Sequence, residues 1–199
     1  MANEIGELFL VSPIPPSVNH YLEYRVINKN GKTMAMSYKP TWVLNYQQDL
    51  FDYICKEVKR QNWNHVPNKT QHFYIDTVFY FPSIDFDANN YFKVFLDTIT
   101  DTQLIWLDDN VTCERVQAIY YDKNNPRMEA TIKPVDYIGV FKDASQLADF
   151  KSRCIDCSRF SRNCSILHRA IEGRIQPEIN NYVCSSHKKK TNKKNKKEN

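Results

Sequence analysis

The feature that most constrains this chain is a run of acidic residues on an apolar frame between Asp85 and Asp109. These twenty-five residues hold six aspartates, one lysine and three amides. Carboxylates that folding brings together repel one another, and a divalent cation is the usual relief. The stretch is therefore predicted to be folded and to form a metal-dependent active site. Its apolar frame consists of Phe86, Phe92, Val94, Phe95, Leu96, Ile99, Ile105 and Trp106.

The spacing of the polar residues predicts which of them share a face. Asp85 and Asp87 are two residues apart, so on an extended strand their side chains point the same way. On a helix, Asn90, Lys93 and Asp97 are three and four residues apart and lie on one face. A strand end and the start of a helix are thus expected to present polar groups to the same point.

Asp108 and Asp109 follow that helix, in the turn before the next predicted strand. Converging carboxylates can hold one or two Mg²⁺ or Mn²⁺ ions, which activate water for phosphodiester hydrolysis. Lys93 is placed to stabilise the developing charge. A purely local interpretation stays open, because Asp and Asn also cluster in turns and caps. Lys93 and Asp97 also fit an ordinary helical ion pair, and Asp101 fits a loop residue.

Hydrophobic periodicity predicts an α+β domain with a mixed β-sheet packed with two main helices. A hairpin or loop is expected around Asn30 and Gly31, a common tight-turn pair. The expected strands are a short one from Leu8 to the following prolines, then 72–81, 114–121 and 127–133, and the expected helices are 40–60 and 89–100.

Charge divides the chain into three parts. Residues 1–140 carry a net −4, residues 141–187 carry +2 and residues 188–199 carry +6, within a total of +4. We interpret these as an acidic nuclease domain, a cysteine-bearing module that opens with a short helix, and a disordered lysine tail. No apolar run approaches the ~20 residues of a membrane span, and the N-terminus lacks a secretory pattern. A cytoplasmic location without membrane contact is expected.

The second part carries four cysteines at metal-ligand spacing. Four thiolates satisfy tetrahedral Zn²⁺, and a small unit with little core needs its metal to fold. Two disulfides are disfavoured in a reducing compartment, and no thioredoxin-like context supports redox thiols. His168 and His187 stay open as substitutes for one sulfur. The sequence predicts a structural zinc site of Cys154, Cys157, Cys164 and Cys184.

The lysines that follow this module are candidate phosphate contacts. Lys188, Lys189 and Lys190 begin the basic tail. Cations that neutralise phosphates give binding without sequence preference, and an acidic domain needs such help to approach DNA. A role as a merely solubilising tail stays open.

Two blocks of the sequence resemble the RusA family of Holliday-junction resolvases, which is frequent in phages and prophages. The first block reads Asp87-Ala-Asn89-Asn90-Tyr-Phe-Lys93-Val-Phe-Leu-Asp97 and is followed by Trp106-Leu-Asp108-Asp109. The second reads Pro15-Pro16-Ser17-Val18-Asn19-His20-Tyr21 and is similar to the family's Pro-Pro-Ser-x-Asn-x-x-Tyr, with one residue fewer before the tyrosine. The similarity spans roughly residues 8–135.

The resemblance implies a homodimer in the bacterial cytoplasm that places two Mg²⁺ or Mn²⁺ sites across a four-way DNA junction. Each site nicks one strand during recombination, repair or replication. The implied catalytic residues are Asp87, Lys93 and Asp109 with Asp85 and Asp108 in support, the implied metal ligands are Asp85, Asp87 and Asp109, and the implied DNA contacts include Asn19 and Asn90.

One position departs from the family pattern. Alignment on Asn90, Lys93 and Asp97 places Asn89 where the family has its second catalytic aspartate. Either Asn89 binds the metal through its carbonyl oxygen, or Asp85 and Asp87 form the pair with two residues inserted before the lysine. If neither restores the site, the alternative is a zinc-containing protein that binds DNA junctions without cutting them.

Overall fold

The computed structural model describes residues 6–29 and 31–190, which form two compact units that meet between Val135 and Asp136. The boundary lies five residues before the predicted one at residue 140. Val135 belongs to the first unit because its amide donates a hydrogen bond of 3.0 Å to the His72 carbonyl. Ile138 already belongs to the second unit, where it forms a β-bridge with Phe141.

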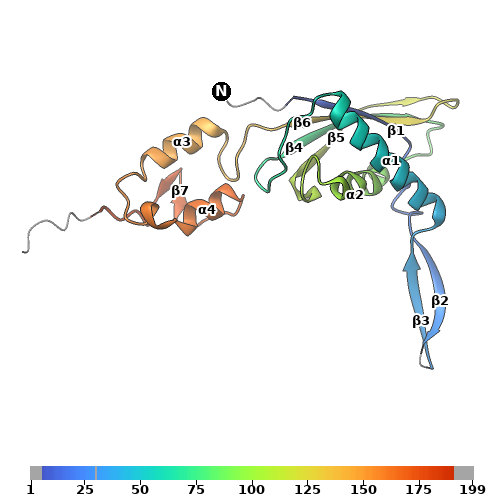
Figure 1. The fold of residues 1–199 in the computed structure, drawn as a ribbon, viewed down its shortest axis with the longest axis horizontal. Coiled ribbons are helices and arrows are strands. Elements are labelled where there is room, and N and C mark those ends of the chain that lie inside the picture. The colour runs from blue at the N-terminus through green and yellow to red at the C-terminus, as the bar shows by residue number, and fades with distance from the viewer. Residues whose placement is uncertain (1–5, 30, 191–199) are drawn as a thin grey trace, which may run out of the picture. The chain divides into compact units, whose positions relative to one another are not determined.

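A four-stranded mixed sheet organises the first unit, in the order β1-β6-β4-β5 (Figure 1). Strands β4 and β5 are parallel, and β6 is antiparallel to both β4 and β1. Parallel neighbours need a crossover connection, and a helix supplies it here. The predicted α+β class with a mixed sheet is confirmed. The strands are β1 (Leu8–Pro13), β4 (Phe73–Phe81), β5 (Thr112–Tyr121) and β6 (Arg127–Pro134).

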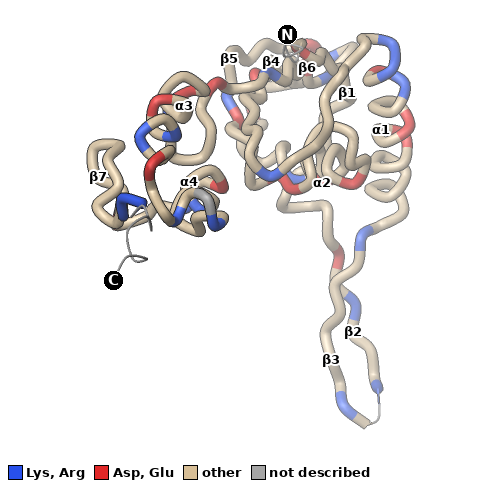
Figure 2. The backbone as a smooth tube through the Cα atoms, turned by 60° about the vertical axis from the view of Figure 1, so that its left-hand side comes forward, with Lys and Arg blue, Asp and Glu red and all other residues tan. Residues whose placement is uncertain are grey.

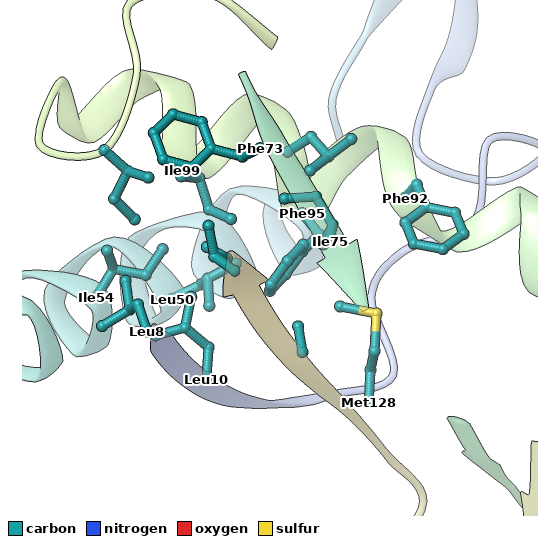
Figure 3. Close-up of a cluster of buried hydrophobic side chains, with 14 of the residues drawn as sticks. Leu8, Leu10, Leu50, Ile54, Phe73, Ile75, Phe92, Phe95, Ile99 and Met128 are labelled. Carbon is teal, nitrogen blue, oxygen red and sulfur yellow. The ribbon is translucent and has the colours of Figure 1, made fainter. Parts of the chain in front are cut away.

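Two helices, α1 (Thr41–Arg60) and α2 (Phe92–Thr102), share one core with the sheet, and both were predicted. Burial alternates along β1, β4 and β6, so one face of the sheet is covered. Figure 3 shows the side chains of both helices converging on those of the strands. The labelled members of this core are Leu8, Leu10, Leu50, Ile54, Phe73, Ile75, Phe92, Phe95, Ile99 and Met128.

Trp106 anchors the turn that leads from α2 to β5. Its side chain is fully buried, and its ring packs against Phe73 with centroids 5.8 Å apart. The indole Nε1 donates a hydrogen bond of 2.7 Å to Thr100 Oγ1, near the end of α2. A buried indole N–H needs such a partner. This bond ties the turn to the helix and thereby sets the path of the chain toward Asp109.

We expect Thr100→Val to destabilise the protein by about 1–3 kcal/mol, because the buried indole N–H loses its acceptor at nearly constant side-chain volume. Chemical denaturation measures this loss. The exposed Thr41, changed to Val, is the matched control. Equal stabilities of the two variants would contradict the anchoring role of the Thr100–Trp106 bond.

The other face of the sheet carries an ion-pair network centred on Asp76. Arg115 donates to both carboxylate oxygens at 2.6 and 2.8 Å, and Gln117 donates a third bond of 2.8 Å. Lys133 Nζ lies 3.6 Å away. The Arg115 hydrogen bonds hold the pKa of Asp76 below its usual range, against the opposing effect of burial, and Gln117 and Lys133 add to the lowering.

A lowered carboxyl pKa stabilises the fold above the ordinary aspartate pKa of 3.8, and this contribution is lost as the pH falls through the folded-state value. Asp76→Asn should therefore lower the Tm at pH 7 by roughly 3–6 °C and reduce its acid dependence below about pH 4. The exposed Asp49→Asn is the control. Thermal scans from pH 7 to pH 3 that show parallel curves for wild type and Asp76→Asn would refute this assignment.

Of the hairpin or loop expected around Asn30 and Gly31, the structure forms a hairpin. Strands β2 (Glu23–Lys29) and β3 (Lys32–Tyr38) pair with each other and stand clear of the sheet and helices (Figure 1). All of their residues except Ile27 and Tyr38 are exposed. Asn30 of the predicted turn lies outside the described residues, and Gly31 adopts a positive φ of 72°.

The second unit is a small helical fold around its own core. The predicted helix after Asp143 is confirmed, because the Asp143 carboxylate accepts the Gln146 amide at 2.7 Å and caps it. Its helices are α3 (Ala144–Ser152) and α4 (Ser165–Ile171), its short strands are β7 (Ile179–Asn180) and β8 (Val183–Cys184), and its core consists of Phe141, Leu147, Phe150, Leu167 and Ala170.

Lys188 to Lys190, the first residues of the predicted disordered tail, pair through their backbone with the second unit. The Lys188 carbonyl accepts the Ser158 amide at 2.7 Å, Lys189 bridges Cys157, and the Lys190 amide donates to the Asp156 carbonyl at 2.8 Å. Backbone pairing thus holds these three lysines in the second unit. The rest of the predicted tail, residues 191–199, lies outside the described residues. Within the described ranges, no helix is both long and apolar enough to span a membrane.

Candidate active site

Lys93, in the first turn of α2, forms the charged centre of the candidate site. Its Nζ donates to Asp97 Oδ1 at 2.5 Å and lies 4.0 Å from Asp109 Oδ2. The hydrogen bond to Asp97 raises the pKa of Lys93, burial opposes it, and the charges of Asp97, Asp109 and Tyr21 reinforce the rise. The side chain is still 47% exposed. Lys93 therefore presents a fixed positive charge to solvent.

An open groove of about 600 Å³ runs beside this lysine, between α2 and the start of β5. Its polar groups are an amide, an ammonium and two carboxylates on an apolar base. This mixture of one cation with oxygen donors suits a phosphate ester and a hard metal ion. The residues lining the groove are Asn89, Phe92, Lys93, Leu96, Asp109, Glu114 and Val116.

Glu114 is a site residue that the sequence reasoning missed. It lies near the start of β5, directly after the acidic stretch, and its side chain reaches the same groove as Asp109. Thr112 Oγ1 lies 2.6 Å from Glu114 Oε1 and 2.8 Å from the Asp109 carbonyl, so its single proton can serve either. The sequence did carry a signal for this position. Residues two apart on a strand share a face, so Glu114 is expected on the same face as Thr112.

The two sequence blocks that carry the family resemblance lie together. The Val18 amide donates to the Asn90 carbonyl at 2.8 Å, which docks the proline-rich turn on the 3₁₀ helix η1 (Ala88–Tyr91). The turn closes through the Tyr21 amide and the Ser17 carbonyl, at 2.9 Å. Tyr21 is also one of the groups that raise the pKa of Lys93. Asn19, a predicted DNA contact, is exposed in this turn.

Asp85 and Asp87, the predicted metal ligands, are not among the residues that line the groove. Strand β4 ends at Phe81, so neither aspartate is on a strand and the expected shared face does not arise. Asp85 lies in the following turn and accepts a 2.9 Å bond from Ser83 Oγ. Asp87 caps η1 and accepts the Asn89 amide at 3.1 Å. Local turn chemistry accounts for both positions.

Asp108, predicted to support catalysis, is also a cap. Its carboxylate accepts the Asn110 amide at 3.0 Å at the start of η2 (Asp109–Val111). Asp109 is the next residue, and its side chain points to the groove instead. Of the two adjacent aspartates, the structure thus gives Asp108 a structural partner and leaves Asp109 beside Lys93.

The predicted metal ligand sets are not assembled in the structure. Among the described residues, no three His, Cys, Asp or Glu side chains are arranged to hold a metal ion. Magnesium, however, commonly keeps several waters and binds one or two protein carboxylates together with substrate phosphates. Asp109 and Glu114 supply two carboxylates, and the side-chain carbonyl of Asn89 adds a third oxygen in the groove. These residues fit Mg²⁺ in the presence of DNA.

The four cysteines of the second unit line one small, apolar cavity together with Phe150 and Phe160. Burial raises the pKa of Cys154, and the charges of the other three thiols raise it further. Burial also acts to raise the pKa of Cys157, but hydrogen bonds from backbone N–H groups outweigh it, so the pKa of this thiol is lowered overall. The first of these donors is the Lys188 amide, 3.5 Å from the Cys157 sulfur. The thiols are gathered but not at ligand geometry.

The two histidines left open as zinc ligands have other partners. His168 Nε2 lies 2.5 Å from Asn163 Oδ1, and His187 Nε2 lies 2.8 Å from Asp156 Oδ1.

No protein-family model matches the chain, and no curated protein matches it significantly.

Proposed function

We propose that residues 1–135 are a Mg²⁺- or Mn²⁺-dependent endonuclease that resolves Holliday junctions and related branched DNA, as the resemblance to the RusA family suggests. The observation that carries this proposal is the groove in which Lys93 lies beside Asp109, with Asn89 and Glu114 in the same lining. An ammonium beside carboxylates that can bind a metal is an arrangement suited to phosphodiester hydrolysis. The docked proline-rich turn supports the proposal, because it brings the second resembling block to this groove.

Each residue of the groove has a distinct proposed role. Asp109 and Glu114, with the Asn89 carbonyl, would hold the metal, which would supply an activated water and neutralise phosphate charge. Lys93 stabilises negative charge that develops on the phosphate oxygens. Asp97 fixes the Lys93 ammonium through its 2.5 Å hydrogen bond and so acts as a positioning residue. Two copies of the chain, acting as a homodimer, would place one such groove on each of two strands of a junction.

Two findings favour the non-cleaving alternative. The groove holds an asparagine where the family has an aspartate, and the described residues contain no ready group of three metal-ligating side chains. A degenerate nuclease domain of this kind would bind branched DNA through its cations and leave it intact. Lys188 and Lys189, exposed on the second unit, are candidate phosphate contacts in both proposals.

Cleavage of a synthetic four-way junction in Mg²⁺ tests the proposal. Asp109→Asn, Glu114→Gln and Lys93→Gln are each expected to slow nicking by roughly 10²-fold or more, because each removes a charge from the groove. The exposed Asp101→Asn, at the far end of the same helix, is the control and should cleave like wild type. Wild-type protein that binds the junction but nicks it in neither Mg²⁺ nor Mn²⁺ would establish the alternative.

In the same junction-cleavage assay, Asp87→Asn shows whether Asp87 is a metal ligand or only a helix cap. A metal ligand would lose cleavage, whereas a cap keeps it, since asparagine caps helices about as well as aspartate.

We further propose that Cys154, Cys157, Cys164 and Cys184 bind one structural Zn²⁺. The shared cavity and the N–H groups that favour a Cys157 thiolate support this proposal. The thiols need only close around the ion, since unliganded zinc units do not hold their bound geometry.

Metal analysis of the purified chain is expected to give one zinc per chain, and Cys157→Ser should lose it together with protease resistance of residues 136–190. The exposed Cys113→Ser, in the first unit, is the control and should retain the zinc. A folded wild-type protein that contains no zinc and gains none on addition would rule the site out.

A further inference from the structure

The β2–β3 hairpin is a ribbon without a partner among the described residues of this chain. Met34 and Met36 are 51% and 37% exposed on one face of the ribbon, and Tyr24 and Val26 are 73% and 71% exposed on the other. An isolated two-stranded hairpin is at best marginally stable in water. Large apolar side chains on such a ribbon indicate that another molecule covers it.

The strand register places all three cations of the ribbon on one face. Arg25 pairs with Met36, Ile27 with Met34 and Lys29 with Lys32, and directly opposed residues of an antiparallel pair lie on the same side. The other face consists of the uncharged Tyr24, Val26, Asn28, Thr33, Ala35 and Ser37. One face thus combines positive charge with an apolar strip. Figure 2 marks the basic positions along the two strands.

The register also opposes two like charges. Lys29 and Lys32 are direct cross-strand partners at the tip of the ribbon. Like charges directly opposite each other destabilise a strand pair. A polyanion bound to this face removes the repulsion, whereas an apolar or basic partner does not. The single carboxylate of the ribbon, Glu23, lies at its base, where it accepts a 2.6 Å bond from Tyr38 Oη.

The base of the ribbon lies beside the 3₁₀ helix η1, which contributes Asn89 to the groove. Strand β2 begins two residues after Tyr21, whose amide closes the proline-rich turn. The same turn is docked on η1 by the Val18–Asn90 hydrogen bond. At about 3.3 Å per residue, the seven residues of β2 extend roughly 23 Å from that point. DNA seated in the groove therefore lies within reach of the ribbon.

We propose that the β2–β3 hairpin is a DNA-binding ribbon that contacts the phosphates of a duplex arm beside the cleavage groove. This inference rests on the proposed function and adds the element that holds the substrate. Arg25, Lys29 and Lys32 contact phosphates, while Ile27, Met34 and Met36 pack against sugars. A two-stranded ribbon fits the major groove of DNA. A second copy of the chain is the competing occupant, and the like charges at the ribbon tip disfavour ribbon-to-ribbon pairing.

The test compares the full-length chain with Arg25→Gln/Lys29→Gln/Lys32→Gln, and the control is Lys56→Gln/Lys59→Gln/Lys69→Gln. The control removes the same charge from exposed positions on α1 and the following loop. Binding to a fluorescent four-way junction is measured by anisotropy in Ca²⁺ over a range of salt concentrations. We expect the ribbon variant to raise Kd tenfold or more and to reduce the salt slope by up to about 3, or ~0.9 per lost contact. The control should match wild type.

The milder Lys29→Gln/Lys32→Gln variant should show about two thirds of that reduction in the salt slope. Circular dichroism checks the fold of every variant. Equal Kd values for the ribbon and control variants would overturn the ribbon assignment while leaving the nuclease proposal standing. A ribbon variant with unchanged Kd but altered mass in solution would instead assign the ribbon to an interface between copies. Wild-type protein without affinity for DNA would overturn both proposals.

Discussion

The packing of α2 against the sheet is the constraint on which the rest of the first unit depends. Phe92, Phe95 and Ile99 fill the core beneath the helix, and the same helix directs Lys93 and Asp97 outward. Because one rigid element provides both the core and the charged centre, the position of the Lys93 ammonium is fixed by apolar burial. The buried Trp106 extends this control to the turn that carries the next carboxylate.

Periodic features of the sequence were sufficient to predict most of this fold. Alternation in β4 and the helical spacing of α1 and α2 follow directly from which face each element buries. The Lys93–Asp97 pair was predictable for the same reason, since residues four apart on a helix are neighbours. The strand order was not predictable, because β6 lies between β1 and β4 through pairings that no local pattern encodes.

The site was predicted only in part, because the side chains of aspartate and asparagine have competing uses. Asp85, Asp87 and Asp108 resemble ligands in the sequence, yet each satisfies a nearby hydroxyl or backbone N–H group. Glu114 reaches the groove from a strand that an isolated pattern would assign to the surface. The lysines at 188–190 looked like free tail because their backbone pairing spans some thirty residues, from Asp156 to Lys190.

Charge placement in the first unit follows from its overall sign. Residues 1–140 carry a net −4, so the proposed DNA substrate would approach against an average repulsion. Cations can offset that repulsion only if they are concentrated where the phosphates lie, since exposed charges are screened beyond roughly 10 Å. Lys93 in the groove and the three cations on one face of the ribbon meet this requirement. Spreading the same charges over the surface would leave the net charge unchanged but give the groove no local attraction for a phosphate.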